Sequence, residues 1–348
     1  MSVTHRAKII GAQYSTFVTL VVLALFFATL SSRFATLQNF QVIILNVAEL
    51  GIVAIPLALL VMAGSVDLSI GSIASVGAVT CGSVMTKTGS VALGILAGVA
   101  FGLAAGALNG FLISVLGLNP IVITLGFLGA WGGLALYLTG GSTISGLPEG
   151  FTDLARFELG PLPLQILILA AVVAVAWFVV NHRPFGRELL AVGGGKRAAH
   201  LMGIRVKRVQ LILFVVTGGA AAIAGIMLSG KLFAAPPTVG LSMELNALLV
   251  ILIGGVAFEG GVGRVSGVLA GLLFIGTLSN GLVIIGVSQF LQAMITGTAL
   301  VMAVALDSTI QKSVRKSWSQ LGAKELSKGS AEDATSSETL SSRSAAGV

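Results

Sequence analysis

Long apolar runs recur along almost the whole chain and leave little room for any other kind of structure. Each run is close to the roughly 20 residues that a helix needs to cross a hydrocarbon core of about 30 Å. Inside that core the backbone must satisfy its own hydrogen bonds, so we interpret the runs as transmembrane helices. The sequence predicts ten spans, near residues 14–31, 41–63, 68–86, 90–116, 120–139, 162–180, 208–230, 244–258, 265–286 and 288–307.

The composition agrees with lipid as the main solvent. Charged residues make up 9% of the chain and the mean hydropathy is +1.02, whereas a soluble domain carries about 25% charged residues. The 46 glycines fit the same interpretation, because small residues let membrane helices approach closely. The predicted fold class is all-α: a polytopic integral membrane protein of about ten transmembrane helices.

The distribution of lysine and arginine predicts the orientation. If the N-terminus is cytoplasmic, ten spans return the C-terminus to the cytoplasm, and only Arg33, Lys87, Arg156 and Lys231 of the 20 basic residues fall outside. This is the bias expected of cytoplasmic connections. The net charge of +7 therefore reflects topology, and we do not expect a nucleic-acid partner.

The same patterns predict the organisation of the chain. Residues 1–13 form a cytoplasmic N-terminus, and residues 14–310 form the transmembrane domain, with a basic cytoplasmic loop at 181–208. Residues 311–348 are rich in Ser, Ala and charge. They bury too little apolar surface to offset the entropy of ordering, so we expect a disordered cytoplasmic tail.

Nothing in the sequence indicates catalysis. The three histidines lack metal-ligand spacing, and Gly193-Gly194-Gly195-Lys196 lacks the flanking residues of a phosphate-binding loop. We expect no catalytic residue, no metal site and no cofactor bound by this chain. If ATP is involved, another chain hydrolyses it.

A few carboxylates fall within or beside the predicted spans, where a charge is costly and is by default a functional candidate. Asp67, Glu244 and Asp307 are near span ends, where water and helix caps can satisfy them, and Asp67 is placed to cap the helix that follows. Glu49 is deeper, and we expect it to face the bundle interior, either in a pore or as a packing group.

The loop 181–208 holds the most informative pattern outside the spans. Gly193-Gly194-Gly195 predicts a turn, and a short helix over 196–202 would stop at Gly203. Such an element can fit a groove in another protein. The alternative is a basic loop that only fixes topology, and charge alone favours this alternative.

Several motifs, in this order, resemble those of one family. They are Gly64-Ser65-Val66-Asp67-Leu68-Ser69-Ile70-Gly71-Ser72, then Asn119-Pro120-Ile121-Val122-Ile123-Thr124-Leu125-Gly126, then the loop from Gly186-Arg187 to Gly203-Ile204, and finally Ile253-Gly254-Gly255 with Gly260-Gly261-Val262-Gly263 and Asn280-Gly281-Leu282. Together they cover most of residues 40–307. The sequence is similar to the permease family of bacterial ABC importers for monosaccharides, of the ribose, galactose, xylose and arabinose type.

The sequence departs from the family pattern at three places. Ser65 replaces a glycine, Gly195 stands where asparagine is usual, and Ala257-Phe258-Glu259 replaces a more common small, hydroxyl-bearing stretch. None of these changes removes a catalytic group.

The resemblance implies a transport subunit rather than an enzyme. Its implied partners are a cytoplasmic ABC ATPase that uses ATP and Mg, a periplasmic sugar-binding protein contacting segment 140–161, and a second permease subunit, identical or not. The implied location is the bacterial inner membrane, with the chain crossing the lipid bilayer many times. The residues implied in coupling to the ATPase are Gly186, Arg187, Gly193, Gly194, Lys196, Ala198, Ala199, Gly203 and Ile204.

The predicted function is translocation of a monosaccharide or related polyol that the binding protein delivers. For the translocation path we predict Asn46, Glu49, Asp67, Asn119, Thr124 and Asn280. An autonomous ion-coupled carrier or facilitator for a small solute is the alternative, although the scarcity of buried ionisable groups speaks against it. A membrane-embedded enzyme is a weaker alternative, because no nucleophile, metal set or acid–base pair is evident.

Overall fold

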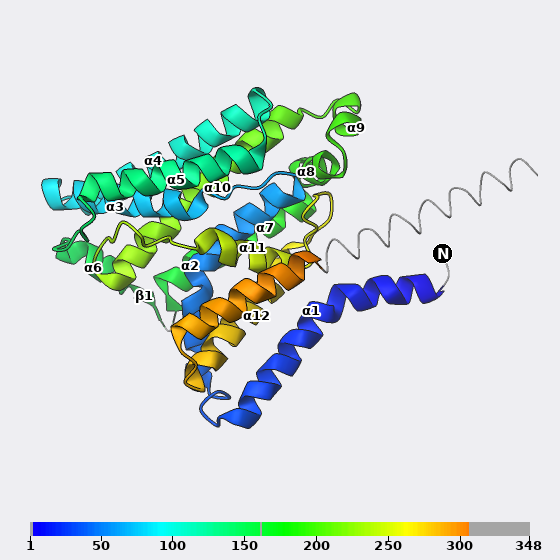
Figure 1. Cartoon of the computed structure of the whole chain (residues 1–348), viewed down its shortest axis with the longest axis horizontal. Helices are drawn as coiled ribbons and strands as arrows, with labels where there is room; N and C mark the ends of the chain where they lie inside the picture. The colour runs from blue at the N-terminus through cyan, green and yellow to red at the C-terminus, as the bar shows by residue number, and fades with distance from the viewer. Residues whose placement is uncertain (1–2, 161, 306–348) are drawn as a thin grey trace, which may run out of the picture. The chain divides into compact units, whose positions relative to one another are not determined.

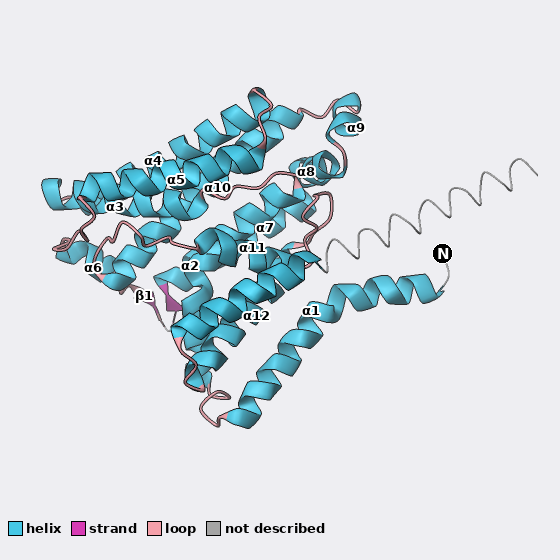
Figure 2. Ribbon diagram, in the orientation of Figure 1, coloured by secondary structure: helices cyan, strands magenta, loops and turns pink. Residues whose placement is uncertain are grey.

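Helices make up nearly all of the structure that the chain adopts. The computed structural model describes the backbone of residues 3–160 and 162–305, with side chains from residue 16 onward. Contacts divide the chain after Leu300, and the description below concerns the unit that ends there. Within the described residues, one antiparallel pair of short strands interrupts the helices: β1 (Glu158–Leu159) and β2 (Leu162–Pro163) (Figure 2). The all-α prediction is confirmed.

The order of elements follows the predicted runs closely, and each of the ten predicted spans overlaps a helix. The helices that overlap the predicted spans are α1 (Val3–Leu30), α2 (Leu37–Met62), α3 (Ile70–Thr88), α4 (Val91–Gly110, continued by a π-helical turn over Phe111–Val115), α5 (Pro120–Thr139), α7 (Leu164–His182), α10 (Val206–Leu232), α11 (Met243–Ile253), α12 (Val265–Ile284) and the helix Gln289–Ala305. Three further helices lie in the connections between them: α6 (Glu149–Ala155), α8 (Pro184–Gly194) and α9 (Lys196–Leu201).

Among the described residues, six helices are long and apolar enough to cross a membrane: α2, α4 with its π-helical turn, α5, α7, α10 and α12. Helix α3 is less apolar because nine of its 19 residues are Gly, Ser or Thr, and it is mostly buried by protein. Helices α2 and α10 are also mostly buried, whereas only 11% of the apolar stretch of α5 and of α7 is buried, as expected of helices that meet lipid or another subunit. The number of crossings and the orientation of the termini stay predictions.

Helix α11 corrects the predicted span 244–258. It ends at Ile253 and has 11 residues, which at 1.5 Å per residue reach only about 16 Å. The helix ends where Gly254 and Gly255 follow, the latter with φ of +75°. Irregular backbone is tolerated at membrane depth only where protein covers it, and Gly254 lies against the backbone of Gly267 in α12.

Glycines at every fourth position of α4 explain its close packing against two other helices. Gly94, Gly98, Gly102, Gly106 and Gly110 form one stripe. A Cβ on Gly98 would lie 2.5 Å from the carbonyl oxygen of Gly77 in α3, and one on Gly102 would lie 2.5 Å from that of Gly218 in α10. The stripe therefore brings three helix backbones into contact, which is the use of small residues expected in membrane helices.

The connections between helices gather at two opposite ends of the helices (Figure 1). At the α6 end, Ile144 and Ala235 exchange two backbone hydrogen bonds of 3.1 and 2.9 Å. At the α8 end, the amide of Gly261 donates to the carbonyl oxygen of Met62 at 2.8 Å. The basic segment 181–208 belongs to the α8 end, which is the end that the predicted topology places in the cytoplasm.

Candidate functional site

A cavity of about 450 Å³ lies between α2, α10, α11, α12 and residues 292–296, within the size range of small-molecule sites. Its walls come from the halves of these helices nearest the α6 end. Most of the lining is apolar. The polar lining residues are Asn46, Glu49, Lys231, Asn246, Ser279, Asn280, Gln292 and Thr296.

Glu49 and Lys231 form an ion pair in the cavity wall. The Glu49 Oε1 and Lys231 Nζ atoms are 3.7 Å apart, and Nζ also donates a hydrogen bond of 3.4 Å to Oδ1 of Asn46. The carboxylate is buried, with 3% of its side chain exposed, while the lysine side chain is 41% exposed. The lysine thus keeps its ammonium group in open space while it reaches the buried acid.

A second hollow, of about 320 Å³, shares this ion pair. Its other wall is formed by the segment between α6 and α7, with Arg156 and Glu158, and by Gln165 at the start of α7. The guanidinium of Arg156 lies 4.7 Å from the ring centre of Phe233. Glu49 and Lys231 therefore stand in the wall common to a hollow at the α6 end and the larger cavity.

Two residues that line the larger cavity each have a buried side-chain oxygen without a hydrogen-bond donor. These oxygens are Oε1 of Glu49, which has only the 3.7 Å ion pair with Lys231, and Oδ1 of Asn280, a residue that is 8% exposed. An unsatisfied buried acceptor costs about 1–3 kcal/mol. A hydroxyl or water in the cavity would remove this cost, so the two oxygens are suited to receive donors from a polar solute.

Asp67 lies outside both hollows, although it was predicted for the same path as Asn46, Glu49 and Asn280. It is fully buried in the connection between α2 and α3. One carboxylate oxygen accepts from the amide and hydroxyl of Ser69, at 2.9 and 2.6 Å, and the other accepts from the Asn109 side chain at 3.1 Å. Ser69 is the residue at the N-cap of α3, so the prediction that Asp67 caps this helix is wrong. Asp67 fixes the turn before it.

Asn119 and Thr124 also lie outside both hollows. Oδ1 of Asn119 accepts from the amide of Ile121 at 2.9 Å and caps α5. The hydroxyl of Thr124 donates to the carbonyl oxygen of Pro120 at 2.8 Å. Both side chains are thus satisfied within their own helix.

Two helices, α8 and α9, make up most of the basic segment 181–208. Helix α9 confirms the short helix predicted over 196–202, whereas α8 was not predicted. Helix α8 begins at Pro184, which suits a first helical position, and it buries Leu189 and Val192. The predicted turn at Gly193-Gly194-Gly195 is wrong, because the first two glycines are helical and only Gly195 separates α8 from α9. The predicted stop at Gly203 is confirmed by its φ of +81°.

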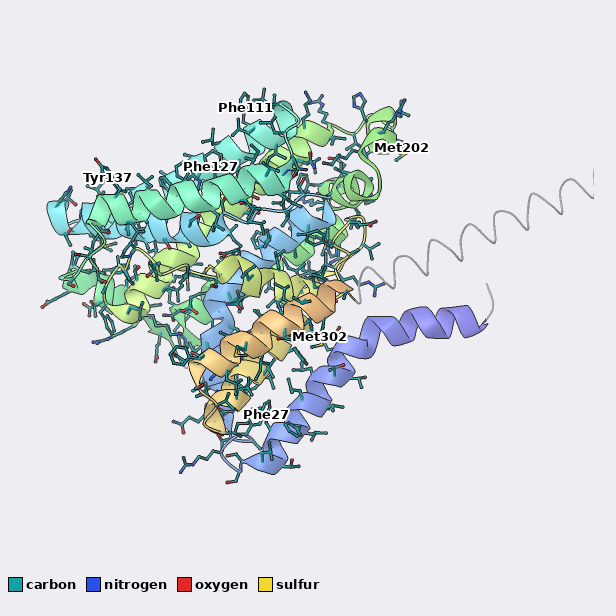
Figure 3. All side chains as sticks on the ribbon, in the orientation of Figure 1. Phe27, Phe111, Phe127, Tyr137, Met202 and Met302 are labelled. Carbon is teal, nitrogen blue, oxygen red and sulfur yellow. The ribbon has the colours of Figure 1, made fainter. Side chains whose placement is uncertain are left out.

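The residues predicted for coupling divide between a buried and an exposed set. Exposed are Arg187, Gly194, Lys196, Ala198 and Gly203; buried are Gly186 and Ala199; Gly193 and Ile204 are intermediate. At the end of α9, Leu201 and Met202 are 80% and 71% exposed. Figure 3 labels Met202. This apolar tip lies beside exposed Lys196 and Arg197, at the end of the molecule that the predicted topology places in the cytoplasm.

Glycines from the end of α8 and from two connections between helices lie in contact. We call this contact the glycine junction, and its members are Gly64, Gly193, Gly194, Gly260 and Gly261. Gly260 and Gly261 have φ of +91° and +76°. A Cβ on Gly260 would lie 2.8 Å from the backbone of Gly64, and one on Gly261 would lie 2.8 Å from that of Gly194. The junction joins α8 directly to the connections 63–69 and 254–264.

Residues 39–304 match a family model described as "Branched-chain amino acid transport system / permease component". The chain belongs to this permease family. It is a multi-pass membrane protein, in agreement with its six long apolar helices. No solved structure matches.

Relatives of this permease are named for sugars. It is 35% identical to the ribose import permease protein RbsC of Bacillus subtilis over 295 residues, which are 84% of this chain and 91% of the relative. It is 33% identical to the L-arabinose transport system permease protein AraH of Escherichia coli, covering 87% and 92%. It is 32% identical to the D-allose transport system permease protein AlsC of Escherichia coli, covering 86% and 93%.

Sequence reasoning missed several residues of this permease that the structure brings into the candidate sites. Lys231 was noted only as one of the few basic residues outside, and its position at the end of a span was the available signal. Leu201 and Met202 directly precede the predicted stop at Gly203, and two large apolar residues in a basic loop could have marked them. Nothing in the sequence placed Asn246, Ser279, Gln292 or Thr296 at the cavity.

Proposed function

We propose that this chain is the membrane-spanning permease subunit of an ATP-binding cassette importer that translocates a monosaccharide or related polyol. The similarity to ribose, arabinose and allose permeases over at least 84% of the chain carries the proposal. A subunit without a catalytic constellation needs a separate ATPase, and in this proposal ATP and Mg are bound there. The same similarity favours an importer over an autonomous ion-coupled carrier.

The ATPase docks on α8 and α9 in this proposal. The exposed apolar tip of Leu201 and Met202 enters a groove of the ATPase, and Lys196 and Arg197 lie beside it to meet acidic residues at the rim. Buried apolar anchors supply most of the affinity at such interfaces, and rim charges mainly set orientation and association rate.

The glycine junction passes movement of α8 to the rest of the permease. Because backbone touches backbone there, α8 cannot shift toward Gly64 or Gly261 without moving the connections 63–69 and 254–264. These connections continue into α3 and α12, and α12 lines the cavity. ATP-driven displacement of α8 would thereby change the access to the cavity.

The two remaining partners in this proposal are a periplasmic binding protein and a second permease subunit. A periplasmic binding protein contacts the segment 140–161 at the α6 end and releases the sugar above the ion pair of Glu49 and Lys231. A second permease subunit meets the exposed side of this one, and the assembly lies in the inner membrane of a bacterium. The permease binds sugar only weakly, because the binding protein selects it.

Reconstitution tests the proposal. The chain is purified from its native membrane, the co-purifying proteins are identified, and uptake of labelled D-ribose, L-arabinose and D-allose into proteoliposomes is measured with and without ATP. We expect an ATPase and a second permease subunit in the complex, and uptake that requires ATP and the binding protein. Uptake by the chain alone without ATP would contradict the proposal.

The description of the family favours branched-chain amino acids as a second candidate for the solute. An ion pair beside an apolar wall could serve the two charges of an amino acid. L-leucine therefore belongs in the same uptake experiment, and ATP-dependent uptake of leucine without uptake of any sugar would favour this candidate.

A further inference from the structure

We propose that the cavity binds a neutral polyhydroxylated solute, with Glu49 and Asn280 as its hydrogen-bond acceptors, and that the Glu49–Lys231 ion pair excludes charged solutes. The inference rests on the proposed function and adds the chemistry of the site to it. It is carried by two oxygens without a hydrogen-bond donor, Oε1 of Glu49 with only the 3.7 Å ion pair and Oδ1 of Asn280, by charge balance and by the position of the ion pair between two hollows.

The acceptor oxygens determine what kind of group the solute must offer. Oε1 of Glu49 and Oδ1 of Asn280 are buried, line the cavity and lack hydrogen-bond partners. Both can only accept. A solute that satisfies them must donate at two points, and a sugar hydroxyl does so while still accepting from Lys231 Nζ or from a side-chain amide.

The charges of the two hollows balance. Glu49 and Lys231 are the charged residues of the larger cavity, and Arg156 and Glu158 are added in the smaller hollow. A solute with a net charge would enter a wall whose own charges already cancel, and it would lose its hydration without gaining a counter-ion. A neutral solute keeps the 3.7 Å ion pair intact, whereas an amino acid would have to separate it.

The position of the ion pair makes it a selective element and not only a packing contact. Asn46, Glu49 and Lys231 line both hollows. A solute released at the α6 end therefore meets Lys231, which is half-exposed, before it reaches Asn280 in α12. The ion pair stands at the entrance, and Asn280 stands in the larger cavity beyond it.

The single native cysteine makes a direct binding test possible. Cys81 is buried, so an introduced cysteine at the exposed cavity residue Ser279 is the accessible thiol. In the assembled importer in proteoliposomes, the Ser279→Cys thiol is labelled with a membrane-impermeant maleimide. The rate is measured with D-ribose, L-arabinose or D-allose, with D-ribose 5-phosphate as the anion and with L-leucine as the zwitterion. Lys87→Cys, which is exposed and remote from the cavity, is the control.

We expect at least one neutral sugar to slow labelling of Ser279→Cys and not of Lys87→Cys, with no protection by the phosphate or by leucine. Adding Asn280→Leu lowers the affinity for the protecting sugar about tenfold, because a hydrogen bond to a buried acceptor is lost without a change of charge. Adding Glu49→Gln leaves Lys231 unpaired, so the phosphate now protects. Adding Glu49→Gln and Lys231→Gln together restores neutrality and removes protection by the phosphate.

The outcomes separate this inference from the proposed function. If ATP-driven sugar uptake is intact but no sugar protects Ser279→Cys, or Glu49→Gln leaves the phosphate without effect, the site is wrong while the importer stands. Protection by leucine or by the phosphate in the Ser279→Cys protein also overturns the inference. Uptake without ATP contradicts the proposed function instead. Co-purification of each variant with the ATPase checks that it has folded.

Discussion

The backbone amide of Gly261 donates a 2.8 Å hydrogen bond to the carbonyl oxygen of Met62, and Gly193 of α8 lies against both groups. Met62 is the last residue of α2, and Gly261 precedes α12. Two helices that line the cavity are therefore joined at their α8 ends through a contact that has room for no side chain. This relationship gives the most direct test of how the basic segment acts on the rest of the permease.

Gly193→Ala and Gly194→Ala form a matched pair at this contact. A Cβ on Gly193 would overlap the Met62 carbonyl and the Gly261 amide, whereas a Cβ on Gly194 would meet nothing within 4 Å. We expect Gly193→Ala to destabilise the protein by about 1–3 kcal/mol, as overpacking does, and to uncouple ATP hydrolysis from uptake. Gly194→Ala should be neutral or stabilise α8 by up to about 1 kcal/mol.

The measurements for this pair are the apparent Tm in detergent and the ratio of ATP hydrolysed to sugar taken up. If both variants behave alike, the junction does not transmit movement.

The exposed apolar tip of α9 predicts a docking variant. Leu201→Ser removes an apolar side chain whose burial in a partner is worth about 1.5–3 kcal/mol. We expect the affinity for the ATPase to fall about tenfold to a hundredfold, with the Tm of the isolated permease unchanged. Leu159→Ser, at the α6 end and also exposed, is the control and should bind the ATPase normally. Equal binding by the Leu201 and Leu159 variants would remove the tip from the interface.

Much of the fold could be predicted because most of the long helices have a local signal in the sequence. Uninterrupted apolar residues placed α5 at residues 120–139 from the sequence, and Asn119-Pro120 marked its start. The end of α11 could not be placed, because Val256, Ala257 and Phe258 continue the apolar run after Gly255 has broken the helix. The backbone after Ile253 is irregular where α12 packs against Gly254, and composition alone does not reveal this contact.

The candidate sites show the same limit more strongly. Glu49 and Asn280 were predicted individually, but their meeting with Lys231 depends on how α2, α10 and α12 pack, and no local pattern encodes it. An isolated acid such as Asp67 looks the same in the sequence whether it lines a path or fixes a turn, and only the structure shows that it lies in the turn between α2 and α3. The α4 glycine stripe, by contrast, was readable at its spacing of four residues and was overlooked.

The α4 glycine stripe predicts that small additions there are costly. Gly102→Ala would place its Cβ 2.5 Å from both the Gly218 carbonyl oxygen and the Ala222 Cβ, so we expect a loss of about 1–3 kcal/mol. Gly129→Ala in α5, where a Cβ would meet nothing within 4 Å, should not destabilise the detergent-solubilised chain. Thermal unfolding of the two variants checks this, and a stable Gly102→Ala protein would show that α10 can move away from α4.

The buried pair of Asp67 and Asn109 predicts a stability effect without a transport site. The Asn109 amide donates to Oδ2 of Asp67 and to the hydroxyl of Ser69, at 3.1 and 2.8 Å. Asn109→Ala leaves the carboxylate with one donor fewer in a buried place, so we expect a loss of about 1.5–3 kcal/mol. Transport per folded molecule should stay normal, because neither residue lines the hollows.

Exchanging the two groups provides the control for this pair. Asp67→Asn combined with Asn109→Asp keeps one amide donating to one carboxylate, and we expect it to recover part of the Tm lost by Asn109→Ala. Recovery would assign the effect to the hydrogen bond itself. If Asn109→Ala instead abolishes uptake while the Tm is unchanged, the connection 63–69 takes part in translocation directly, and the turn-fixing role of Asp67 is wrong.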